Sequence, residues 1–371
     1  MFLLLLFLLL SNISYTETRM NNLPQGFKWR YIMDETAPSP RSGQFWRSGI
    51  LLEDKIIVLN AYNLIALDLK GKELWKKGLA AENPFSEAKI YRTESNEIVV
   101  IITDALIRIN TDTGEMIKNF GYDVRKKSAF QFTELLPRHS ILFKDLIYVF
   151  LGPQLISFHK KTLERNIVET FNSSPKTLPI QYKDSFILGF LNNFVQSFNP
   201  ISKANRTLVF GASESDFVIR QPVVKDELLF IPTSKDIQVY SNDTLFSKSD
   251  YFTNNILSIT GTSIWLRQHQ IGTIYKIDET LTSIKQTEFT PNKYASKIGI
   301  PLAGNDDILV HIDGIKGTLF IITQKPDLQL KKTIYSEEFI DNPPIQLLAQ
   351  QNNLILLGGF EGLYLIDIDL L

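Results

Sequence analysis

Pairs of short apolar strands recur along almost the whole chain. Each pair has an apolar run, a turn rich in Gly, Asn or Asp, and a second run in which apolar and polar residues alternate. A period of two residues is typical of β-strands, and turn residues between such runs predict hairpins. The pairs end at Asp68, Asn110, His159, Asn199, Ser241, Asp278, Thr323 and Asp367. These ends are 42, 49, 40, 42, 37, 45 and 44 residues apart, so the sequence repeats about every 43 residues.

The spacing leaves room for two further strands between successive pairs. "MIKNFGY" after Asn110 and "DFVIRQPVVK" before the fifth pair are examples. Four-stranded antiparallel units cannot bury both faces alone, and a sustained period of this length is typical of blades stacked around an axis. We therefore expect an all-β fold, an eight-bladed β-propeller of four-stranded antiparallel blades. Two β-sandwiches are the alternative architecture, but they would not explain the period.

The last repeat is incomplete. The first unit continues from Asp68 through Gly71 to Trp75, whereas the eighth ends shortly after Asp367 without a tryptophan. Near the N-terminus, "GFKWRYIM" supplies an unattached strand that contains Trp29. We expect this N-terminal strand to be the outermost strand of the last blade, which would close the ring and remove an exposed sheet edge.

The segment "IALDLKGKELWKKG" resembles the tryptophan-docking repeat of quinoprotein-type, or PQQ-like, propellers. Their usual pattern is A-x-D-x-x-x-G-x-x-x-W with Thr before Gly; Ala66, Asp68, Gly71 and Trp75 follow it with one residue missing. The resemblance implies that Asp holds the amides of a turn, that Gly takes a positive φ and that Trp packs between blades.

A second copy, "RINTDTGEMIK", keeps part of the same pattern. It has Thr113 and Gly114, but Asn110 replaces Asp and Lys118 stands where Trp is expected. Later units are more degenerate. The expected structural repeat motif comprises Ala66, Asp68, Gly71, Trp75, Asn110, Thr113, Gly114, Trp29 and Asp367.

PQQ-like propellers have two functional branches. One binds pyrroloquinoline quinone and oxidises alcohols or sugars; the other has lost the cofactor and serves as a scaffold, as in the BamB-type subunit of the outer-membrane β-barrel assembly machinery. The chain resembles the scaffold branch, because quinoprotein dehydrogenases are much longer and usually carry a vicinal cysteine pair, whereas this chain has no cysteine. The resemblance implies no cofactor and no enzymatic activity. The absence of cysteine also excludes lipid attachment at a lipobox.

The first residues, "MFLLLLFLLL", have the length of a signal-peptide apolar core, about half of a bilayer span. We expect residues 1–16 to be a signal peptide, or an uncleaved anchor, and 17–371 to be a single propeller domain. Localisation would be the periplasm and cell envelope, or a secretory lumen and the extracellular space. Sequons begin at Asn172, Asn205 and Asn242 and matter only in a glycosylating host.

The charges are balanced. Lys plus Arg number 39 and Asp plus Glu 40, for a net charge of −1, without long runs of either sign. This pattern predicts no nucleic-acid partner and, at most, peripheral contact with a membrane.

Candidate chemistry is sparse. The four histidines lack metal-ligand spacing, and His159 stands at the turn position of Asp68, where a hydrogen-bonding role is expected. Asp306 and Asp307 are expected in a turn. Trp46, Trp265 and Arg267 are of the residue types that dominate binding hot spots, so they are candidate interface residues, with inter-blade packing as the alternative.

These observations favour an exported, monomeric, non-enzymatic scaffold of the PQQ-like or BamB-like type that binds one or more proteins. The resemblance implies a role in membrane-protein assembly. The alternatives are a small quinoprotein oxidoreductase that binds pyrroloquinoline quinone and a carbohydrate-binding propeller. A quinoprotein would absorb visible light and need calcium, whereas the scaffold and the carbohydrate-binding protein are not distinguished by sequence.

Overall fold

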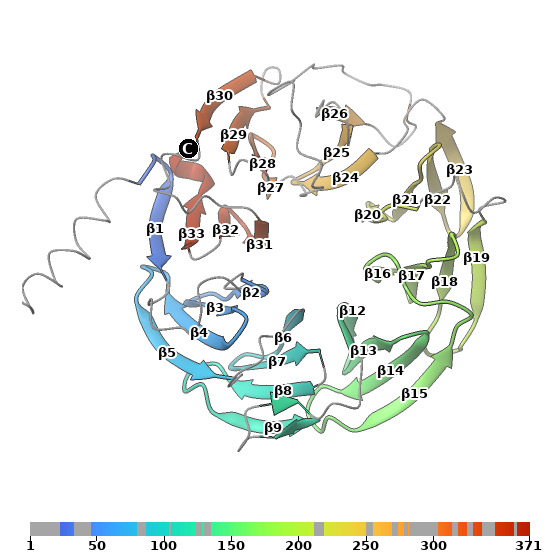
Figure 1. Ribbon diagram of the computed structural model, residues 1–371. Helices are drawn as coiled ribbons and strands as arrows, with labels where there is room; N and C mark the ends of the chain where they lie inside the picture. The colour runs from blue at the N-terminus through green and yellow to red at the C-terminus, as the bar shows by residue number, and fades with distance from the viewer. Residues whose placement is uncertain are drawn as a thin grey trace, which may run out of the picture.

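The computed structural model shows a ring of small sheets around one axis (Figure 1). It describes residues 23–32, 46–79, 87–103, 105–123, 128–129, 135–210, 219–249, 255–268, 274–277, 281, 303–313, 318–324, 329–335, 346–359 and 362–371. The chain is an eight-bladed β-propeller, which confirms the predicted fold class. Residues 1–16 lie outside the described residues, so the signal peptide and the domain boundary after it stay predictions.

Blades 1 to 4 follow one another along the first half of the chain. Blade 1 contains β2 (Ser48–Leu51), β3 (Lys55–Leu59), β4 (Asn63–Asp68) and β5 (Glu73–Gly78). Blade 2 contains β6 (Ala88–Glu94), β7 (Glu97–Ile102), β8 (Ala105–Asn110) and β9 (Met116–Phe120), and a hairpin of β10 (Tyr122–Asp123) and β11 (Ser128–Ala129) follows it. Blade 3 contains β12 (Leu135–Phe143), β13 (Leu146–Leu151), β14 (Gln154–His159) and β15 (Arg165–Thr170). Blade 4 contains β16 (Ile180–Tyr182), β17 (Ser185–Gly189), β18 (Phe194–Phe198) and β19 (Asn205–Phe210).

Blades 5 to 8 complete the ring. Blade 5 contains β20 (Val223–Lys225), β21 (Leu228–Pro232), β22 (Ile237–Ser241) and β23 (Thr244–Ser249). Blade 6 has three strands within the described residues, β24 (Asn255–Thr260), β25 (Ser263–Gln268) and β26 (Ile274–Ile277). Blade 7 contains β27 (Ala303–Gly304), β28 (Ile308–Asp313), β29 (Thr318–Thr323) and β30 (Gln329–Ile334). Blade 8 contains β31 (Gln346–Gln351), β32 (Leu354–Gly358), β33 (Gly362–Asp367) and β1 (Phe27–Ile32), and the 3-10 turn η2 (Ile368–Leu370) ends the chain.

In blades 1 to 7 the described strands run outward from the axis in sequence order and are antiparallel to their neighbours, whereas in blade 8 the outermost strand is β1. The third strands of the eight blades, β4, β8, β14, β18, β22, β26, β29 and β33, coincide with the second strands of the predicted pairs. Each third strand ends at the predicted residue or one residue before it. The period in the sequence is therefore the repeat of one blade.

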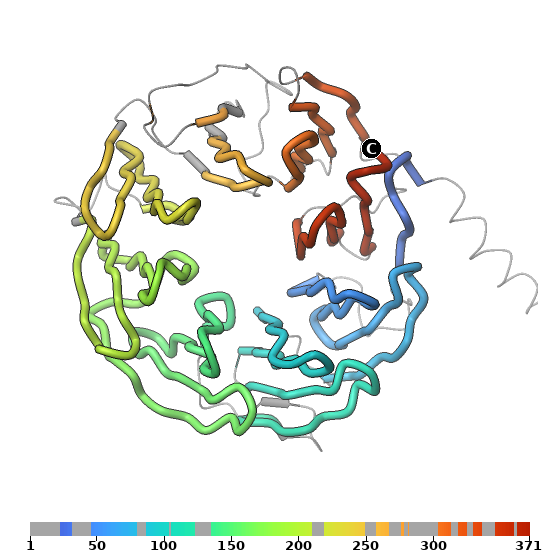
Figure 2. Tube along the Cα trace, turned by 180° about the vertical axis from the view of Figure 1, so that it is seen from behind, coloured from blue at the N-terminus to red at the C-terminus, as the bar shows by residue number. Residues whose placement is uncertain are grey.

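Blade 8 is built from both ends of the chain. Its order is β1-β33-β32-β31, and Trp29 of β1 is paired with Leu365 of β33. Figure 2, which views the ring from behind, shows the first and last segments side by side. The predicted closure of the ring by an N-terminal strand in the last blade is confirmed.

Apolar side chains fill the boundaries between blades. A separate cluster of buried residues lies at each of the eight boundaries. Middle strands such as β3 (KIIVL) are buried at every position, because a neighbouring blade covers each face of the sheet. This burial explains why the first strand of each predicted pair is a continuous apolar run. No helix of the described part of the chain is long and apolar enough to cross a membrane.

Candidate functional site

The turn between the third and fourth strands of blade 1 is held by Asp68. The backbone N–H groups of Lys70 and Lys72 each donate to Oδ1 of Asp68 over 2.9 Å. The N–H of Gly71 donates to the carbonyl oxygen of Asp68 over 3.0 Å, and Gly71 has φ +85°. A side-chain carboxylate and a glycine at positive φ thus form one compact turn.

The indole of Trp29 lies on this turn from the neighbouring blade. A Cβ added at Gly71 would lie 2.7 Å from Cδ2 of Trp29, so the ring occupies the space that a side chain would need. Nε1 of Trp29 donates to the carbonyl oxygen of Leu69 over 3.0 Å, and the side chain is 2% exposed. Blade 8 therefore docks on blade 1 through a Trp-on-Gly contact.

The same contact recurs between blades 1 and 2. Trp75, which is paired with the buried Ala66, covers Gly114, where an added Cβ would lie 2.8 Å from Cδ2 of the indole. Nε1 of Trp75 donates to the carbonyl oxygen of Thr111 over 2.9 Å. Leu69 and Thr111 both follow the residue that holds the turn, so the two docking contacts are equivalent.

In blade 2 the turn itself is held by Asn110. Its Oδ1 accepts from the N–H groups of Asp112 and Thr113, and Oγ1 of Thr113 accepts from the N–H of Glu115 over 3.2 Å. Gly114 has φ +70°. The structural repeat motif from the sequence is thus brought together at two successive turns.

Blades 3 and 4 keep the turn with other residues. Nδ1 of His159 accepts from the N–H groups of Lys161 and Thr162, each over 3.3 Å, which confirms the turn role expected for this histidine. Asn199 does the same in blade 4, where its Oδ1 accepts from two N–H groups over 2.9 Å. Leu163 at φ +54° and Lys203 at φ +58° stand where the first two blades have glycine.

In blade 8 the corresponding turn is assembled from the two ends of the chain. The N–H of Asp367 donates to the carbonyl oxygen of Gly26 over 3.0 Å, as the N–H of Asp68 donates to Lys72 over 2.9 Å in blade 1. Oδ1 of Asp367 accepts from the N–H of Asp369 over 3.2 Å, and Oδ2 pairs with Nζ of Lys28 at 2.9 Å. Asp367 thus holds a turn whose second half comes from the N-terminus.

The candidate interface tryptophans are buried. Trp46 and Trp265 are each 1% exposed. Nε1 of Trp46 donates to the carbonyl oxygen of Gly362 over 3.0 Å, and Nε1 of Trp265 donates to Oγ1 of Thr260 over 2.8 Å. Both side chains pack between neighbouring blades, which is the inter-blade packing that the sequence left open as the alternative. Arg267 lies in β25, and its side chain is outside the described residues.

The acidic pair of blade 7 lies in the turn between β27 and β28, as expected. Oδ1 of Asp306 accepts from the N–H and from Oγ1 of Thr262 in blade 6, over 2.6 and 2.8 Å. The N–H of Asp307 donates to Oδ1 of Asn305 over 3.0 Å. Asp306 thus joins two neighbouring blades.

The boundary between blades 3 and 4 has no Trp-on-Gly contact. In blade 1 the outer strand bulges at Leu74, next to the docking Trp75, whereas in blade 3 the bulge is at Val168. Ile167 is four residues beyond Leu163, as Trp75 is beyond Gly71, but its side chain is 60% exposed. Because a bulge reverses the alternation of side chains, its position decides which one faces the neighbouring blade.

Phenylalanine rings fill this boundary. Phe171 is central, with its ring centroid 5.0 Å from that of Phe190 and 5.4 Å from that of Phe198. Phe190 in turn lies 6.2 Å from Phe194. These tilted and edge-to-face arrangements are those that aromatic pairs prefer. Flat rings on both sides of this boundary leave space at its outer rim.

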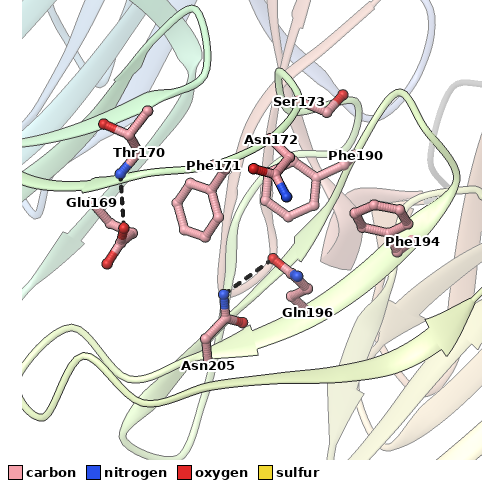
Figure 3. A pocket seen from close by; sticks show the side chains of 9 residues that line it. All are labelled: Glu169, Thr170, Phe171, Asn172, Ser173, Phe190, Phe194, Gln196 and Asn205. Carbon is pink, nitrogen blue, oxygen red and sulfur yellow. Dashed lines mark hydrogen bonds between the residues drawn. The ribbon is translucent and has the colours of Figure 1, made fainter.

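That space is a small pocket, shown in Figure 3. It is lined by Glu169, Thr170, Phe171, Asn172, Ser173, Phe190, Phe194, Gln196 and Asn205. Most of its exposed lining is polar, with Nδ2 of Asn205 and Oε1 of Gln196, 3.4 Å apart, at the rim. The buried rings of Phe171 and Phe190 lie beneath. We name it the blade 3–4 pocket.

The blade 3–4 pocket has a cavity volume of about 90 Å³. Sites for small molecules and cofactors usually enclose about 300 to 1,000 Å³. The pocket therefore suits a single side chain or a similarly small group. A small, mostly polar recess above buried aromatic rings suits a short side chain that can form hydrogen bonds at the rim.

Comparison with known proteins bears on the fold. The chain matches no protein-family model and no curated protein. It is similar to the crystal structure of BamB from Moraxella catarrhalis, with a TM-score of 0.65, 11% sequence identity, and coverage of 93% of this chain and 98% of that one. It is also similar to Hsv2 from Kluyveromyces lactis, with a TM-score of 0.52, 10% identity, and coverage of 78% and 98%. The chain has a BamB-like fold.

This likeness confirms the predicted resemblance to BamB-like propellers at the level of fold. At 11% identity it carries no residue roles across, so the candidate site depends on this chain alone. Sequence reasoning missed the blade 3–4 pocket. Its signal was the density of phenylalanine between positions 171 and 198, where "FILGFLNNFVQSF" has four.

Proposed function

We propose that the chain is an exported, non-enzymatic scaffold that binds a protein partner, of the type represented by BamB-like propellers. The blade 3–4 pocket carries this proposal, because its small volume fits a single side chain of a partner better than a cofactor. A role in membrane-protein assembly is the specific form that the likeness to BamB favours.

The closed ring supports this function by keeping the pocket in shape. Both chain ends are paired within blade 8, and Trp29 and Trp75 fix the two blades that follow the closure. A site held on packed strands needs little ordering when a partner binds, so less of the interaction energy is lost. The scaffold would therefore present its pocket as a preformed surface.

Strand addition at the outer rim is the less favoured mode of binding. The outermost strands of blades 1, 2 and 5 bulge at Leu74, Ile117 and Phe246. Exposed lysines such as Lys76 and Lys118 accompany these bulges. Bulges and edge lysines are the devices by which sheets prevent edge pairing. We therefore assign partner contact to the pocket and to loops.

A site-specific crosslink tests the proposal. A photoreactive residue at Ser173, on the pocket rim, should crosslink the exported protein to one discrete partner in its own envelope or lumen, and Gln196→Trp should abolish the product by filling the pocket. The matched control places the photoreactive residue at Lys76, on the rim of blade 1. Equal products from both positions, or products that Gln196→Trp leaves unchanged, would contradict a pocket-centred scaffold.

Two further readouts come from the same preparation. N-terminal sequencing should show that the exported protein begins at Glu17, since residues 1–16 are the expected signal peptide. The purified protein should be colourless, whereas visible absorbance that depends on calcium would favour the quinoprotein alternative.

A further inference from the structure

Five consecutive blades place basic side chains at the beginning of their innermost strands. These residues are Arg47, Lys89, Arg138, His139, Lys176 and Arg220, which we name the basic mouth. They stand in or just before β2, β6, β12, β16 and β20, the strands nearest the axis in blades 1 to 5 (Figure 1). They are separated by up to 173 residues in sequence (220 minus 47), so only the fold gathers them.

The register places these residues at one end of the axis. The N–H groups of Arg47, Lys176 and Arg220 donate to Leu59, Gly189 and Pro232, over 2.7, 2.7 and 2.9 Å. Each acceptor is the last residue of the second strand of its blade. Innermost strands run in the same direction in every blade, so these three positions share one level.

Lys89, Arg138 and His139 lie near the same level in blades 2 and 3. Lys89 is paired with Ile101, one residue before the end of β7. Arg138 and His139 lie in an irregular part of β12, opposite the last residues of β13. The basic mouth is therefore a partial ring at one face of the propeller.

The charges of the basic mouth act on one another. Burial lowers the pKa of Lys89, and the positive charge of Arg138 lowers it further. Burial and Arg138 also lower the pKa of Arg47. In the neighbouring blades, burial lowers the pKa of Lys176, with a further contribution from Arg220. The basic mouth thus holds like charges close together and partly shielded from water.

One carboxylate moderates this repulsion among the described residues. Oε1 of Glu87 lies 3.8 Å from Nε of Arg138, and Glu87 acts against the lowered pKa of Arg47 and of His139. The couplings that the structure describes are nevertheless mainly between like charges, namely Arg47 with Arg138, Lys89 with Arg138, and Lys176 with Arg220. Like charges held partly out of water are relieved when an anion binds between them.

The spread of the cluster argues for an extended ligand. Neighbouring sheets pack about 10 Å apart, so residues from five blades cannot all reach one small ion. An extended peptide advances about 3.3 Å per residue and can present several carboxylates to such an arc. Because these side chains are partly buried, a single extended peptide can reach them more readily than a nucleic-acid duplex can.

We propose that the basic mouth binds an acidic peptide segment of a protein partner. This inference rests on the proposed function, in that the ligand is part of a protein, and it adds the chemistry that the partner must have and the face of the ring that it meets.

The experiment uses the exported protein and a fluorescein-labelled deca-glutamate peptide, with binding followed by fluorescence anisotropy. Arg138→Gln with Lys176→Gln should weaken binding at least about tenfold, because each contact to a charged group contributes that much or more. Lys76→Gln with Lys77→Gln removes two charges from the outer rim of blade 1 and should change affinity less than about twofold. Deca-glutamine should not bind.

Three outcomes would overturn the inference. They are no binding of deca-glutamate by the wild-type protein, equal weakening in the two double variants, and displacement of the peptide by inorganic phosphate but not by chloride of the same ionic strength. If the Arg138 and Lys176 variant does not fold, a photoreactive deca-glutamate on the wild-type protein replaces it. Crosslinks at the beginning of β6, β12 or β16 support the inference, and crosslinks elsewhere contradict it.

Failure here is distinguishable from failure of the scaffold proposal. If a partner crosslinks at Ser173 while deca-glutamate does not bind, the scaffold stands and the acidic ligand is wrong. If deca-glutamate binds the mouth but no partner crosslinks at Ser173, the pocket-centred scaffold is wrong.

Discussion

The boundary between blades 1 and 2 and the boundary between blades 3 and 4 begin from the same turn and are filled differently. In blades 2 and 4 an asparagine, Asn110 or Asn199, holds the turn amides. At the first boundary Trp75 crosses to the turn and covers Gly114. At the second, phenylalanines fill the seam and a pocket opens at the rim. The turn and the dock are therefore separable parts of the repeat.

The difference shows what each part requires. The turn needs a hydrogen-bond acceptor and a residue at positive φ, and His159 with Leu163 satisfies it as Asp68 with Gly71 does. The Trp-on-Gly contact has stricter requirements than the turn. The indole fits only where the turn residue has no Cβ and where the bulge directs the tryptophan toward the neighbouring blade. A blade can therefore lack the Trp-on-Gly contact and still keep the hydrogen-bonded turn.

Trp29→Ala should have the largest effect on the docked side of this comparison. The indole is 2% exposed, covers Gly71 and lies in the strand that closes the ring. Truncation of a buried tryptophan should lower the free energy of unfolding by about 3 to 5 kcal/mol. Urea unfolding followed by circular dichroism measures it, and a loss below about 0.5 kcal/mol would refute the docking role.

Trp75→Ala and Ile167→Ala compare the two boundaries directly. Trp75 is half-buried and docked, so its truncation should cost about 2 kcal/mol, less than that of a fully buried tryptophan. Ile167 is 60% exposed, and its truncation should stay within about 0.5 kcal/mol. The same unfolding assay serves both variants. Equal costs would show that blade 3 docks as blade 1 does.

Gly71→Ala tests the Trp-on-Gly contact itself. A Cβ there would lie 2.7 Å from the indole of Trp29 and would force alanine to φ +85°. We expect a cost of about 2 kcal/mol, of which about 1 is backbone strain. In a Trp29→Ala background only the strain should remain, so a double-mutant cycle should give a coupling of about 1 kcal/mol. Additive costs would mean that the two residues do not share the contact.

His159→Asn should have the smallest effect. Asparagine holds the same turn in blades 2 and 4, so stability should change by less than about 0.5 kcal/mol, whereas His159→Ala should lose about 1 kcal/mol with the two hydrogen bonds. Thermal unfolding of the two variants checks this order. A larger loss for asparagine than for alanine would contradict the turn role.

The fold could be predicted because its cause is periodic. Every blade needs a buried hairpin, so pairs of apolar strands recur along the sequence. The eighth unit lacks its outermost strand, and this gap predicted that the N-terminal strand with Trp29 completes the last blade. The motif predicted that tryptophan packs between blades, but not that the indole lies on the glycine of the next turn. Trp46 and Trp265 could not be placed from residue type alone, because an aromatic residue serves a core and an interface equally well, and both proved buried.

The phenylalanine-rich segment indicated an aromatic boundary, but the position of the pocket and the existence of the basic mouth could not be predicted, for two physical reasons. Counted from the turn, the bulge of the outermost strand lies two residues later in blade 3 than in blade 1, and the apolar pattern does not reveal this difference. The sequence therefore did not show that Val168, rather than Ile167, packs at the boundary with blade 4. The mouth comes from residues outside the repeated motif, such as Lys89 and Arg138, whose proximity depends on the register of different blades. The balanced total charge gave no sign of this cluster of basic residues.

The pairing of both chain ends in blade 8 sets an order of folding. Lys28 and Asp367 form an ion pair across 339 residues of sequence, so this contact closes a very long loop. Such long-range contacts form late, because the entropy of loop closure must be overcome before they contribute. During synthesis β1 is made long before β33, so the two strands can pair only once β33 has been made. We therefore expect the strand that closes the ring to join its blade last, so that Trp29 reaches its buried position only at the end of folding.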